Sequence, residues 1–286
     1  MNEIRVATRN SRLALAQAAL VAERLRAAHP RLGVRLIPVV TTGDADQRSS
    51  ITELTELGAF VRAVQEVVLA GEADLAVYSL KDLPVAEWDE LVLAAIPERA
   101  SPFDVLVGRG LDELAAGALV GTGSPRRREQ LLELRPDLQT TELRGNIDTR
   151  LRKVADEKVD AAILAEAGLV RLAEIRQIAY RFESWEMVPA PGQGALAVEA
   201  RRGSEAASLA EAIDDHLVRR TVTAERMLLA ETGAGCRAAL GALATWQGGQ
   251  LHLDAFVADD RGRRRASGIG ETAEAVVADV RKALGL

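Results

Sequence analysis

The first 40 residues alternate between strand and helix patterns, and this alternation constrains the fold more than any other feature of the chain. Residues 4–7 form a short strand pattern, and Ser11 can cap a helix that extends to about His29. A second strand is predicted at 34–40. A strand, a helix and a strand of this size make a βαβ unit, so the sheet is predicted to be largely parallel.

Two segments interrupt the alternation and are interpreted as crossings between domains. The first is 98–102, after which the strand and helix pattern begins again. The second is 188–195, which is rich in proline and glycine and leads into a predicted strand at 196–200. Between and before these crossings, further strands are predicted at 73–78, 91–96, 119–121, 140–143 and 160–164.

Two other regions differ from this pattern. The polar stretch 42–57 has no apolar stripe and is interpreted as a mobile loop or lid. The last part of the chain is predicted to be a small α+β domain with an antiparallel sheet and a closing helix, at 239–245, 251–257, 264–269 and 272–284.

Composition restricts the classes of function. The chain has 286 residues, 48% hydrophobic and 27% charged, which is typical of a globular protein with two or three domains. It lacks both a run of about 18 apolar residues that would span a bilayer and the apolar core of a signal peptide, so a cytoplasmic location is predicted. The net charge of −6 argues against nucleic-acid binding. Three scattered histidines and one cysteine form no metal-ligand cluster by their spacing, so no metal is expected.

Cys236 is the only cysteine, and Gly233 and Gly235 precede it. A lone thiol cannot form an internal disulfide, so it either fills space in the core or carries chemistry. Packing is the commoner role of an isolated cysteine. The glycines favour a tight turn and leave room for a large group beside the sulfur, and we therefore interpret Cys236 as the attachment site of an organic group.

Arginines gather where predicted strands pass into helices. After the strand at 119–121, Ser124 can act as the N-cap of a helix and Pro125 suits its first position. Arg126 and Arg127 then lie in the first helical turn. Cations oppose the helix dipole at that place, so an anionic ligand is predicted there.

Three other arginines also lie near the ends of predicted strands or the starts of predicted helices. Arg9 falls at the end of the first strand, where α/β sheets place ligand contacts, although a solvated arginine fits this position equally well. Arg144 follows a predicted strand and is expected to be tucked against its end. Arg150 fits a solvated helix start as well as it fits a binding site.

Lys81 and Asp82 follow the strand at 73–78 and precede a rigid Leu83-Pro84 turn. Such a pair on a surface turn is usually only solvated. Here the buried strand before it and the proline after it indicate that both groups point from the sheet edge into a cleft. An aspartate held there can transfer protons or stabilise a developing cation, so Asp82 is a candidate catalytic residue.

Seven motifs in one order carry a resemblance to a known family: Thr8-Arg9 with Ser11, Ser79-Leu80-Lys81-Asp82, Gly123-Ser124 with Arg126-Arg127, Arg144-Gly145-Asn146, Gly192-Gln193-Gly194, Ala224-Glu225-Arg226 and Gly235-Cys236. In these motifs the chain closely resembles the porphobilinogen deaminases, also called hydroxymethylbilane synthases. The resemblance implies an α/β fold with two domains like those of type II periplasmic binding proteins, plus a small C-terminal α+β domain. The implied domains are 1–97 with 192–213, then 98–191, then 214–286.

The resemblance also implies a chemistry. A dipyrromethane cofactor is bound covalently through Cys236, and four porphobilinogen molecules are joined head to tail into hydroxymethylbilane with release of ammonia, a step of tetrapyrrole (haem) biosynthesis. Asp82 and Lys81 are the implied catalytic residues. The implied cofactor-binding residues are Cys236, Arg9, Lys81, Asp82, Thr122, Ser124, Arg126, Arg127, Arg144 and Gly145. The implied substrate-binding residues are Arg9, Phe60, Arg144, Arg150 and Gln193.

Three positions depart from the family pattern. Tyr78 stands where the family usually has histidine, Leu57 where many members have a basic or small polar residue, and Ala239 where proline is common. The first departure is expected to alter cofactor packing or the pH dependence, and the second weakens any cationic role of the predicted lid.

The transferase is expected to be a monomer. Two other classes of function compete with it. The alternative is a non-catalytic two-lobed anion-binding protein, under which the cysteine-bearing domain has no purpose. A cysteine-dependent hydrolase lacks a histidine near Cys236 in the sequence, although one could approach in space.

Overall fold

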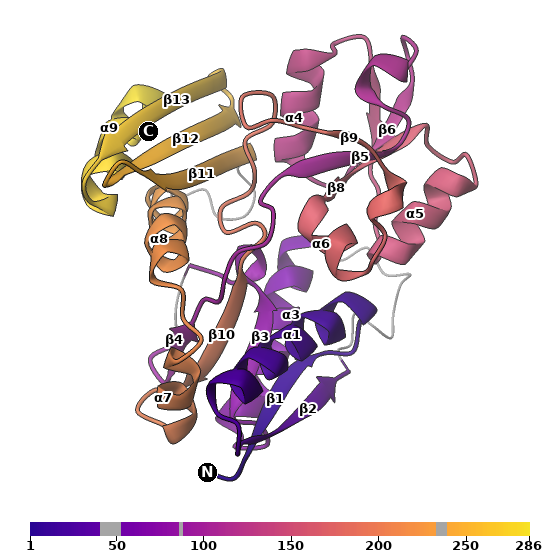
Figure 1. Cartoon of the computed structure of the whole chain (residues 1–286). Helices are drawn as coiled ribbons and strands as arrows, with labels where there is room; N and C mark the ends of the chain where they lie inside the picture. Colours follow the sequence, from indigo (N-terminus) through magenta and orange to yellow (C-terminus); the bar gives the residue numbers. More distant parts are fainter. Residues whose placement is uncertain (41–52, 86–87, 233–238) are drawn as a thin grey trace. The chain divides into compact units, whose positions relative to one another are not determined.

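The chain folds into two compact units, which are described separately. The structure, a computed structural model, describes residues 1–40, 53–85, 88–232 and 239–286 (Figure 1). The first unit comprises Met1–Ala100 and Ala195–Arg219, and the second comprises Ser101–Gly194 and Arg220–Leu286. The chain therefore passes between the units within both segments that were interpreted as crossings. The division into three domains stays a prediction.

The first unit is built on a five-stranded sheet with the order β2-β1-β3-β10-β4. β1 pairs in parallel with both β2 and β3, whereas β10 is antiparallel to β3 and β4. The predicted parallel character is thus confirmed, with one reversed strand. The bounds are β1 (Glu3–Arg9), β2 (Gly33–Val39), β3 (Leu75–Ser79), β4 (Leu91–Ala95) and β10 (Leu196–Arg201).

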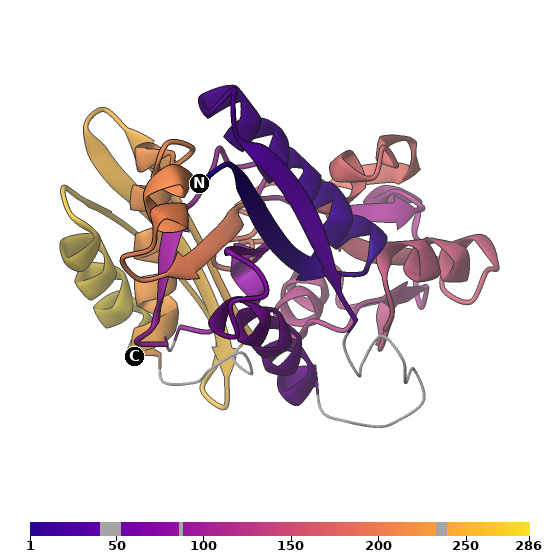
Figure 2. The same ribbon diagram turned by 90° about the horizontal axis from the view of Figure 1, so that it is seen from below.

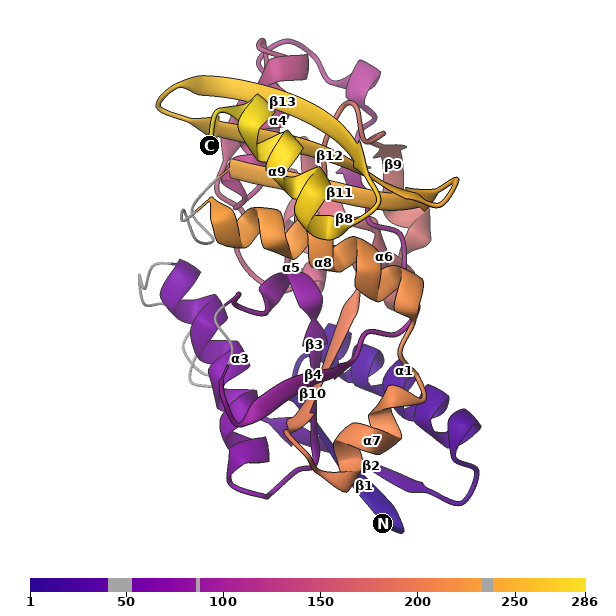
Figure 3. The same ribbon diagram turned by 90° about the vertical axis from the view of Figure 1, so that its left-hand side faces the viewer.

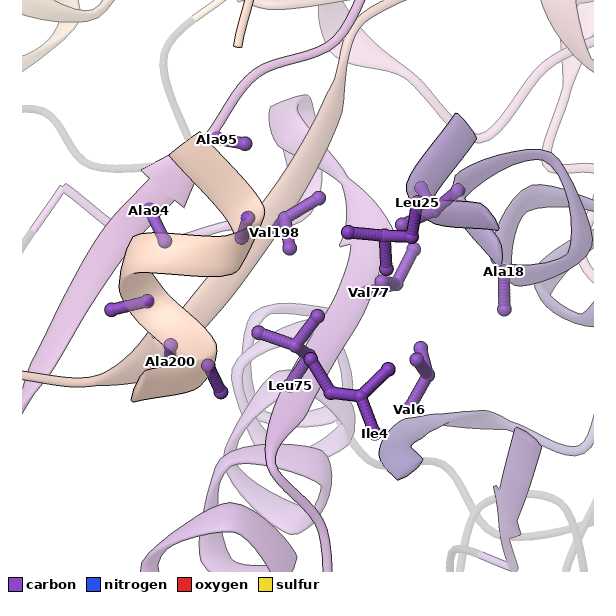
Figure 4. Close-up of a cluster of buried hydrophobic side chains, with 14 of the residues drawn as sticks. Ile4, Val6, Ala18, Leu25, Leu75, Val77, Ala94, Ala95, Val198 and Ala200 are labelled. Atoms are coloured by element: carbon purple, nitrogen blue, oxygen red, sulfur yellow. The ribbon is translucent and has the colours of Figure 1, made fainter. Parts of the chain in front are cut away.

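Helices cover both faces of this sheet. α1 (Arg12–Ala28) begins at the predicted cap, because the Ser11 side chain accepts a hydrogen bond from the Ala14 amide. On the face of α1 and α7 (Glu205–Glu211), apolar side chains of β1, β3 and β10 form one core cluster, shown in Figure 4. Burial of a side chain such as Leu25, which is fully enclosed there, stabilises the fold by about 1.5–3 kcal/mol.

The opposite face carries α3 (Glu53–Leu69), which Figure 2 shows beside the strands. Gln65 of α3 donates a hydrogen bond of 2.8 Å to the Glu199 carboxylate on β10, and both side chains are buried. Residues 53–57 are helical, so the prediction of a loop over them is wrong. The rest of that predicted lid, up to residue 52, lies outside the described residues, as does the side chain of Leu57.

The second unit contains a sheet with the order β7-β6-β8-β5-β9. β6 is parallel to β7 and β8, and β5 is antiparallel to β8 and β9. The sequence analysis did not predict β5 or β9. The strands are β5 (Asp104–Gly108), β6 (Leu119–Gly121), β7 (Gln139–Thr141), β8 (Ala161–Ala165) and β9 (Ile178–Arg181). The helices are α4 (Pro125–Leu134), α5 (Ile147–Ala155) and α6 (Glu166–Arg171).

A second, three-stranded sheet completes this unit and confirms the predicted α+β tail. Its antiparallel strands are β11 (Ala239–Gln247), β12 (Gln250–Asp259) and β13 (Gly262–Gly270). α8 (His216–Glu231) and α9 (Ala273–Leu284) contribute to the apolar cluster on one face, and Figure 3 shows α9 across the strands.

The other face of this small sheet lies against the segment after β9. The Ala242 amide donates a hydrogen bond of 2.9 Å to the Pro189 carbonyl, and Val188 packs with Leu243. Gly241 permits this close approach, because a Cβ atom there would lie 2.6 Å from the Val188 carbonyl oxygen. None of the helices in the described part of the chain combines the length and the hydropathy needed to cross a membrane.

Candidate active site

The backbone around Lys81 and Asp82 is fixed on both sides. β3 ends at Ser79 and passes directly into a 3₁₀ turn, η1 (Leu80–Asp82). The Leu80 amide donates to the Ala195 carbonyl at 3.0 Å, and the Leu83 amide donates to the Leu80 carbonyl at 3.1 Å. Lys81 and Asp82 are half-buried. The turn therefore holds both charged groups at the end of a buried strand while part of each stays accessible.

Arg9 and Phe60 lie together in the same unit. Arg9 ends β1, the parallel neighbour of β3, so it lies at the sheet edge where η1 begins. Its guanidinium carbon is 3.8 Å from the centroid of the Phe60 ring on α3, in a cation–π contact. One edge of the first sheet thus carries an arginine, an aromatic ring, a lysine and a carboxylate, all of which the sequence analysis named.

Tyr78 precedes this edge on β3. Its side chain is 6% exposed, and its hydroxyl has no hydrogen-bond partner among the residues that the structure describes. A buried hydroxyl without a partner costs free energy, because it has lost its hydrogen bonds to water. This residue is the one that departs from the family's usual histidine, and its effect on the cofactor stays a prediction.

In the second unit the predicted cap of α4 is confirmed. The Ser124 side chain accepts a hydrogen bond of 3.4 Å from the Arg127 amide, and Pro125 occupies the first helical position. The Thr122 hydroxyl in turn accepts a hydrogen bond of 3.2 Å from the Ser124 amide. The Gly-rich turn and the cap therefore fix the start of the helix that carries Arg126 and Arg127.

Asp104, the first residue of β5, is fully buried against these two arginines. Its Oδ2 lies 2.7 Å from Arg126 Nη1, and its Oδ1 lies 2.7 Å from Arg127 Nη2 and 2.9 Å from Arg127 Nε. Burial acts to raise the pKa of Asp104, but the two guanidinium charges and their hydrogen bonds hold that pKa well below its usual range. Burial also lowers the pKa of Arg126, an effect that Asp104 opposes.

The anion that offsets the arginines on α4 is therefore supplied in part by the protein itself. The prediction that a ligand alone supplies this charge is therefore wrong. Within the described residues, two guanidiniums face one carboxylate, so the cluster keeps a net charge of +1. The binding roles of Arg126 and Arg127 stay predictions.

Gln193 belongs to the same cluster. Its side chain is fully buried, and its amide nitrogen donates to the Pro102 carbonyl at 2.7 Å and to Asp104 Oδ1 at 3.0 Å. The structure thus places Gln193 beside Asp104, and its predicted contact with substrate is untested.

Arg144, Gly145 and Arg150 form a separate group after β7, with the first two residues before α5 and Arg150 within it. Arg144 is exposed and pairs with Glu142 at 2.6 Å, so the prediction that it is tucked against a strand end is wrong. Arg150 Nε donates to the Gly145 carbonyl at 2.7 Å. Glycine is required at 145, because φ is +108° and a Cβ atom would lie 3.0 Å from Thr149.

Arg171 was not predicted from the sequence. This residue ends α6, and its Nη2 donates to the Gly194 carbonyl at 2.7 Å, while its buried Nε has no partner within the described residues. Burial lowers the pKa of Arg171 to about 10. No motif marks this arginine. Its place after β8, at the end of a short helix, is the one signal that could have identified it.

Glu225 explains one of the motifs that carried the resemblance. Its carboxylate is fully buried and accepts hydrogen bonds from the Gly192 amide at 2.7 Å and the Ala244 amide at 2.9 Å. It therefore joins α8 both to the crossing segment and to β11. Cys236, three residues before β11, lies outside the described residues.

The two five-stranded mixed sheets with their strand-end groups, and the small antiparallel sheet near the C-terminus, define an α/β protein with an α+β tail. Family comparisons then identify the particular family. The model described as "Porphobilinogen deaminase, dipyromethane cofactor binding domain" matches residues 4–208, and "Porphobilinogen deaminase, C-terminal domain" matches residues 219–285. The chain belongs to the porphobilinogen deaminase family.

Individual proteins agree with this assignment. A porphobilinogen deaminase of Acidothermus cellulolyticus is 47% identical over 270 residues, covering 92% of this chain and 81% of that protein. One of Desulforudis audaxviator is 42% identical over 282 residues, covering 96% and 91%. Among solved structures, the methionine binding protein MetQ aligns at 12% identity with a TM-score of 0.46, covering 79% of this chain and 95% of that one.

Proposed function

We propose that Asp82 is the catalytic carboxylate and Lys81 its cationic neighbour in a porphobilinogen deaminase reaction. The chain is a transferase that condenses four porphobilinogen molecules head to tail into hydroxymethylbilane and releases ammonia, in tetrapyrrole biosynthesis. Membership of the porphobilinogen deaminase family supports this activity. The comparisons lend no support to a non-catalytic anion-binding protein.

The geometry of η1 suits Asp82 for this role. Loss of ammonia leaves a cation on the substrate, and a nearby carboxylate stabilises that charge. Asp82 is held by backbone hydrogen bonds on both sides of its turn and is half-buried, so it needs little reorganisation to face the cation. The same carboxylate accepts hydrogen bonds from pyrrole N–H groups and relays protons. Lys81 contributes a positive charge to the binding of substrate carboxylates.

The donor chemistry of the second unit fits a dipyrromethane cofactor bound through Cys236. When bound, this group supplies the pyrrole carbon to which the first substrate is joined. Each pyrrole carries carboxylates, and arginine binds carboxylates with two parallel hydrogen bonds. A guanidinium has five N–H donors. Within the described residues, Arg126 uses only Nη1 in hydrogen bonds, so Nε and Nη2 can serve a ligand.

The remaining site residues complete the proposed assignment. Thr122, Ser124, Arg144 and Gly145 bind the cofactor together with Arg9, and Arg150 and Gln193 contribute to substrate binding. Phe60 packs against a pyrrole ring and already holds the Arg9 guanidinium at 3.8 Å. To these we add Arg171, because a half-buried arginine whose enclosed Nε has no partner within the described residues favours an anionic ligand.

The net charge of +1 in the Asp104 cluster is the observation that carries the binding proposal. Intact-mass spectrometry of freshly purified protein tests it. Wild type is expected to carry an adduct of two pyrrole units, which Cys236→Ala lacks. Wild type that is folded, supplied with porphobilinogen and still unmodified would contradict the proposal. A colour assay is the second arm, because hydroxymethylbilane oxidises to a porphyrin that absorbs visible light.

We further propose that the protein acts as a cytoplasmic monomer that binds no nucleic acid. The net charge of −6 supports the last point. Light scattering during gel filtration is expected to give a mass near 30.6 kDa, and twice that value would rule out a monomer.

A further inference from the structure

We propose that Asp104 is a positioning residue, which sets the orientation of the arginine pair on α4 for carboxylate binding. The inference rests on the proposed function, because it takes Arg126 and Arg127 as groups that bind pyrrole carboxylates. Asp104 itself is fully buried, so it acts through the arginines and does not touch a ligand.

Each guanidinium is held at two points that come from different parts of the second unit. Arg126 Nη1 donates to Asp104 Oδ2 at 2.7 Å and to the Val188 carbonyl at 2.7 Å. Arg127 donates to Asp104 Oδ1 from Nε and Nη2, and its Nη1 donates to the Ile163 carbonyl at 3.0 Å. Among the residues that the structure describes, the carboxylate is the one partner that the two arginines share, so it fixes their mutual geometry.

The carboxylate is in turn locked in place. Asp104 begins β5 opposite Ala165, the last residue of β8, and Gln193 donates a hydrogen bond of 3.0 Å to its Oδ1. Both oxygens therefore have partners, and the side chain has no space to rotate at zero exposure. The position of β5 therefore fixes the positions of Arg126 and Arg127 through the hydrogen bonds of Asp104.

Charge explains why a carboxylate is needed for this purpose. The arginine side chains are 5% and 7% exposed, so their mutual repulsion is poorly screened by water. A carboxylate between them offsets this repulsion and keeps them adjacent. One positive charge remains for an incoming carboxylate.

The internal comparison of the two sheets supports the pairing of these residues. Leu196 begins β10 opposite Ser79, the last residue of β3, and thus has the place in the first sheet that Asp104 has in the second. Counted from the caps Ser11 and Ser124, Leu13 and Ala14 correspond to Arg126 and Arg127. The carboxylate and the two arginines are therefore present together in one sheet and absent together from the other.

The test compares Arg127→Gln with the double variant Asp104→Asn/Arg127→Gln. Both keep Arg126 and differ only in the carboxylate. The test takes Arg126 to bind the carboxylates of the porphobilinogen units joined to the cofactor as well as those of the cofactor. If Asp104 positions Arg126, the KM for porphobilinogen is then higher in the double variant, by about tenfold for the loss of one charge-assisted hydrogen bond. If Asp104 only adjusts charge, the order reverses, because the cluster is neutral in Arg127→Gln and has a charge of +1 in the double variant. Equal KM values would also overturn the proposal.

Asp104→Glu is the second variant, because it keeps the charge and moves the carboxylate by one methylene. A positioning role predicts a raised KM, with kcat per cofactor-loaded molecule changing less, whereas an unchanged KM contradicts it. Thermal unfolding and intact mass identify the folded, loaded fraction of each variant. Wild type controls for the function itself: if it forms no hydroxymethylbilane, the proposed function fails, whereas an active wild type with the wrong KM order removes only the role of Asp104.

Discussion

The two five-stranded sheets share one strand plan and differ in what they carry at the strand ends. In each, three parallel neighbours are followed by a reversed strand and an outer strand, in the orders β2-β1-β3-β10-β4 and β7-β6-β8-β5-β9. In the first sheet, Lys81 and Asp82 stay half-buried on a turn that backbone hydrogen bonds hold. In the second, Arg126 and Arg127 are buried and a side-chain carboxylate holds them.

The two sheets thus show two ways of holding a charged side chain in a fixed position. A turn that is held by backbone hydrogen bonds leaves its side chains accessible. The free-energy cost of desolvating the charges is then small, because they keep contact with water. Two buried guanidiniums repel each other and lose their hydration, so they need a carboxylate such as Asp104 that offsets one of the two charges. The two sheets share one strand plan although the residues at their strand ends differ, so the fold does not depend on those residues.

The largest expected effect is a loss of turnover when Asp82, at the end of a strand of the first sheet, is replaced. Asp82→Ala is expected to keep the fold and to lower kcat by roughly 100-fold or more, because a positioned acid–base group contributes about 10²–10⁴. Steady-state formation of porphyrin from porphobilinogen measures it. Asp89→Ala, an exposed carboxylate of the same unit, is the matched control and should retain wild-type turnover. Normal turnover in Asp82→Ala would remove this residue from catalysis.

The second effect concerns the stability of the second sheet. Because the pKa of Asp104 is lowered in the folded state, its contribution is complete above the unfolded pKa of about 3.9 and is lost as pH falls towards the folded value. Asp104→Asn is expected to lower the free energy of unfolding by about 3–5 kcal/mol at pH 7. Urea unfolding at pH 7 and pH 3 measures it. A difference between wild type and variant that does not shrink at the lower pH argues against an ionised Asp104.

A third prediction concerns the pKa of Tyr180. The chain has two tyrosines, one in each unit. The Tyr180 hydroxyl donates a hydrogen bond of 2.6 Å to Glu186, and this bond, together with burial, raises the pKa of Tyr180 to about 12. The bond therefore stabilises the fold below pH 10 and is lost as pH rises towards 12. Ultraviolet titration of Tyr78→Phe, which leaves Tyr180 as the single phenol, should give this raised value. A midpoint near 10 would show that the bond is absent in solution.

The smallest effect is expected at Tyr78. Its hydroxyl has no partner within the described residues, so Tyr78→Phe removes a buried polar group and leaves no new one unpaired. We expect the free energy of unfolding to rise by up to about 1 kcal/mol. Tyr180→Phe is the opposite case, because it leaves Glu186 Oε1 without the phenol donor, while the Glu183 amide still donates to Oε2, and it should destabilise the protein. If thermal unfolding moves in the same direction in both variants, the contrast between the two tyrosines fails.

Local patterns allowed much of the fold to be predicted. The caps at Ser11 and Ser124 and the three C-terminal strands follow from side-chain chemistry and from apolar runs within a few residues. β5 and β9 were missed, because their short runs become strands only by pairing with partners elsewhere in the chain. The start of α3 was missed because a polar segment gives no apolar periodicity.

In the candidate site, too, local features could be predicted and contacts between distant residues could not. The positions of Arg9, Lys81 and Asp82 at one sheet edge follow from strand order and could be predicted. The contact of Arg126 and Arg127 with Asp104 joins residues about twenty positions apart and depends on a strand that the sequence did not reveal. Arg144 was placed wrongly because nothing in the sequence distinguishes a surface pair with Glu142 from a buried strand end.

The place of β10 in the first sheet has a consequence for synthesis on the ribosome. This strand lies between β3 and β4 in space, yet the chain reaches it only at Leu196, after all five strands of β7-β6-β8-β5-β9 have been made. During synthesis, β4 therefore has no neighbouring strand in the first sheet until β10 is made, whereas all strands of the second sheet are already available. Of the two five-stranded sheets, the one that begins first is therefore completed second.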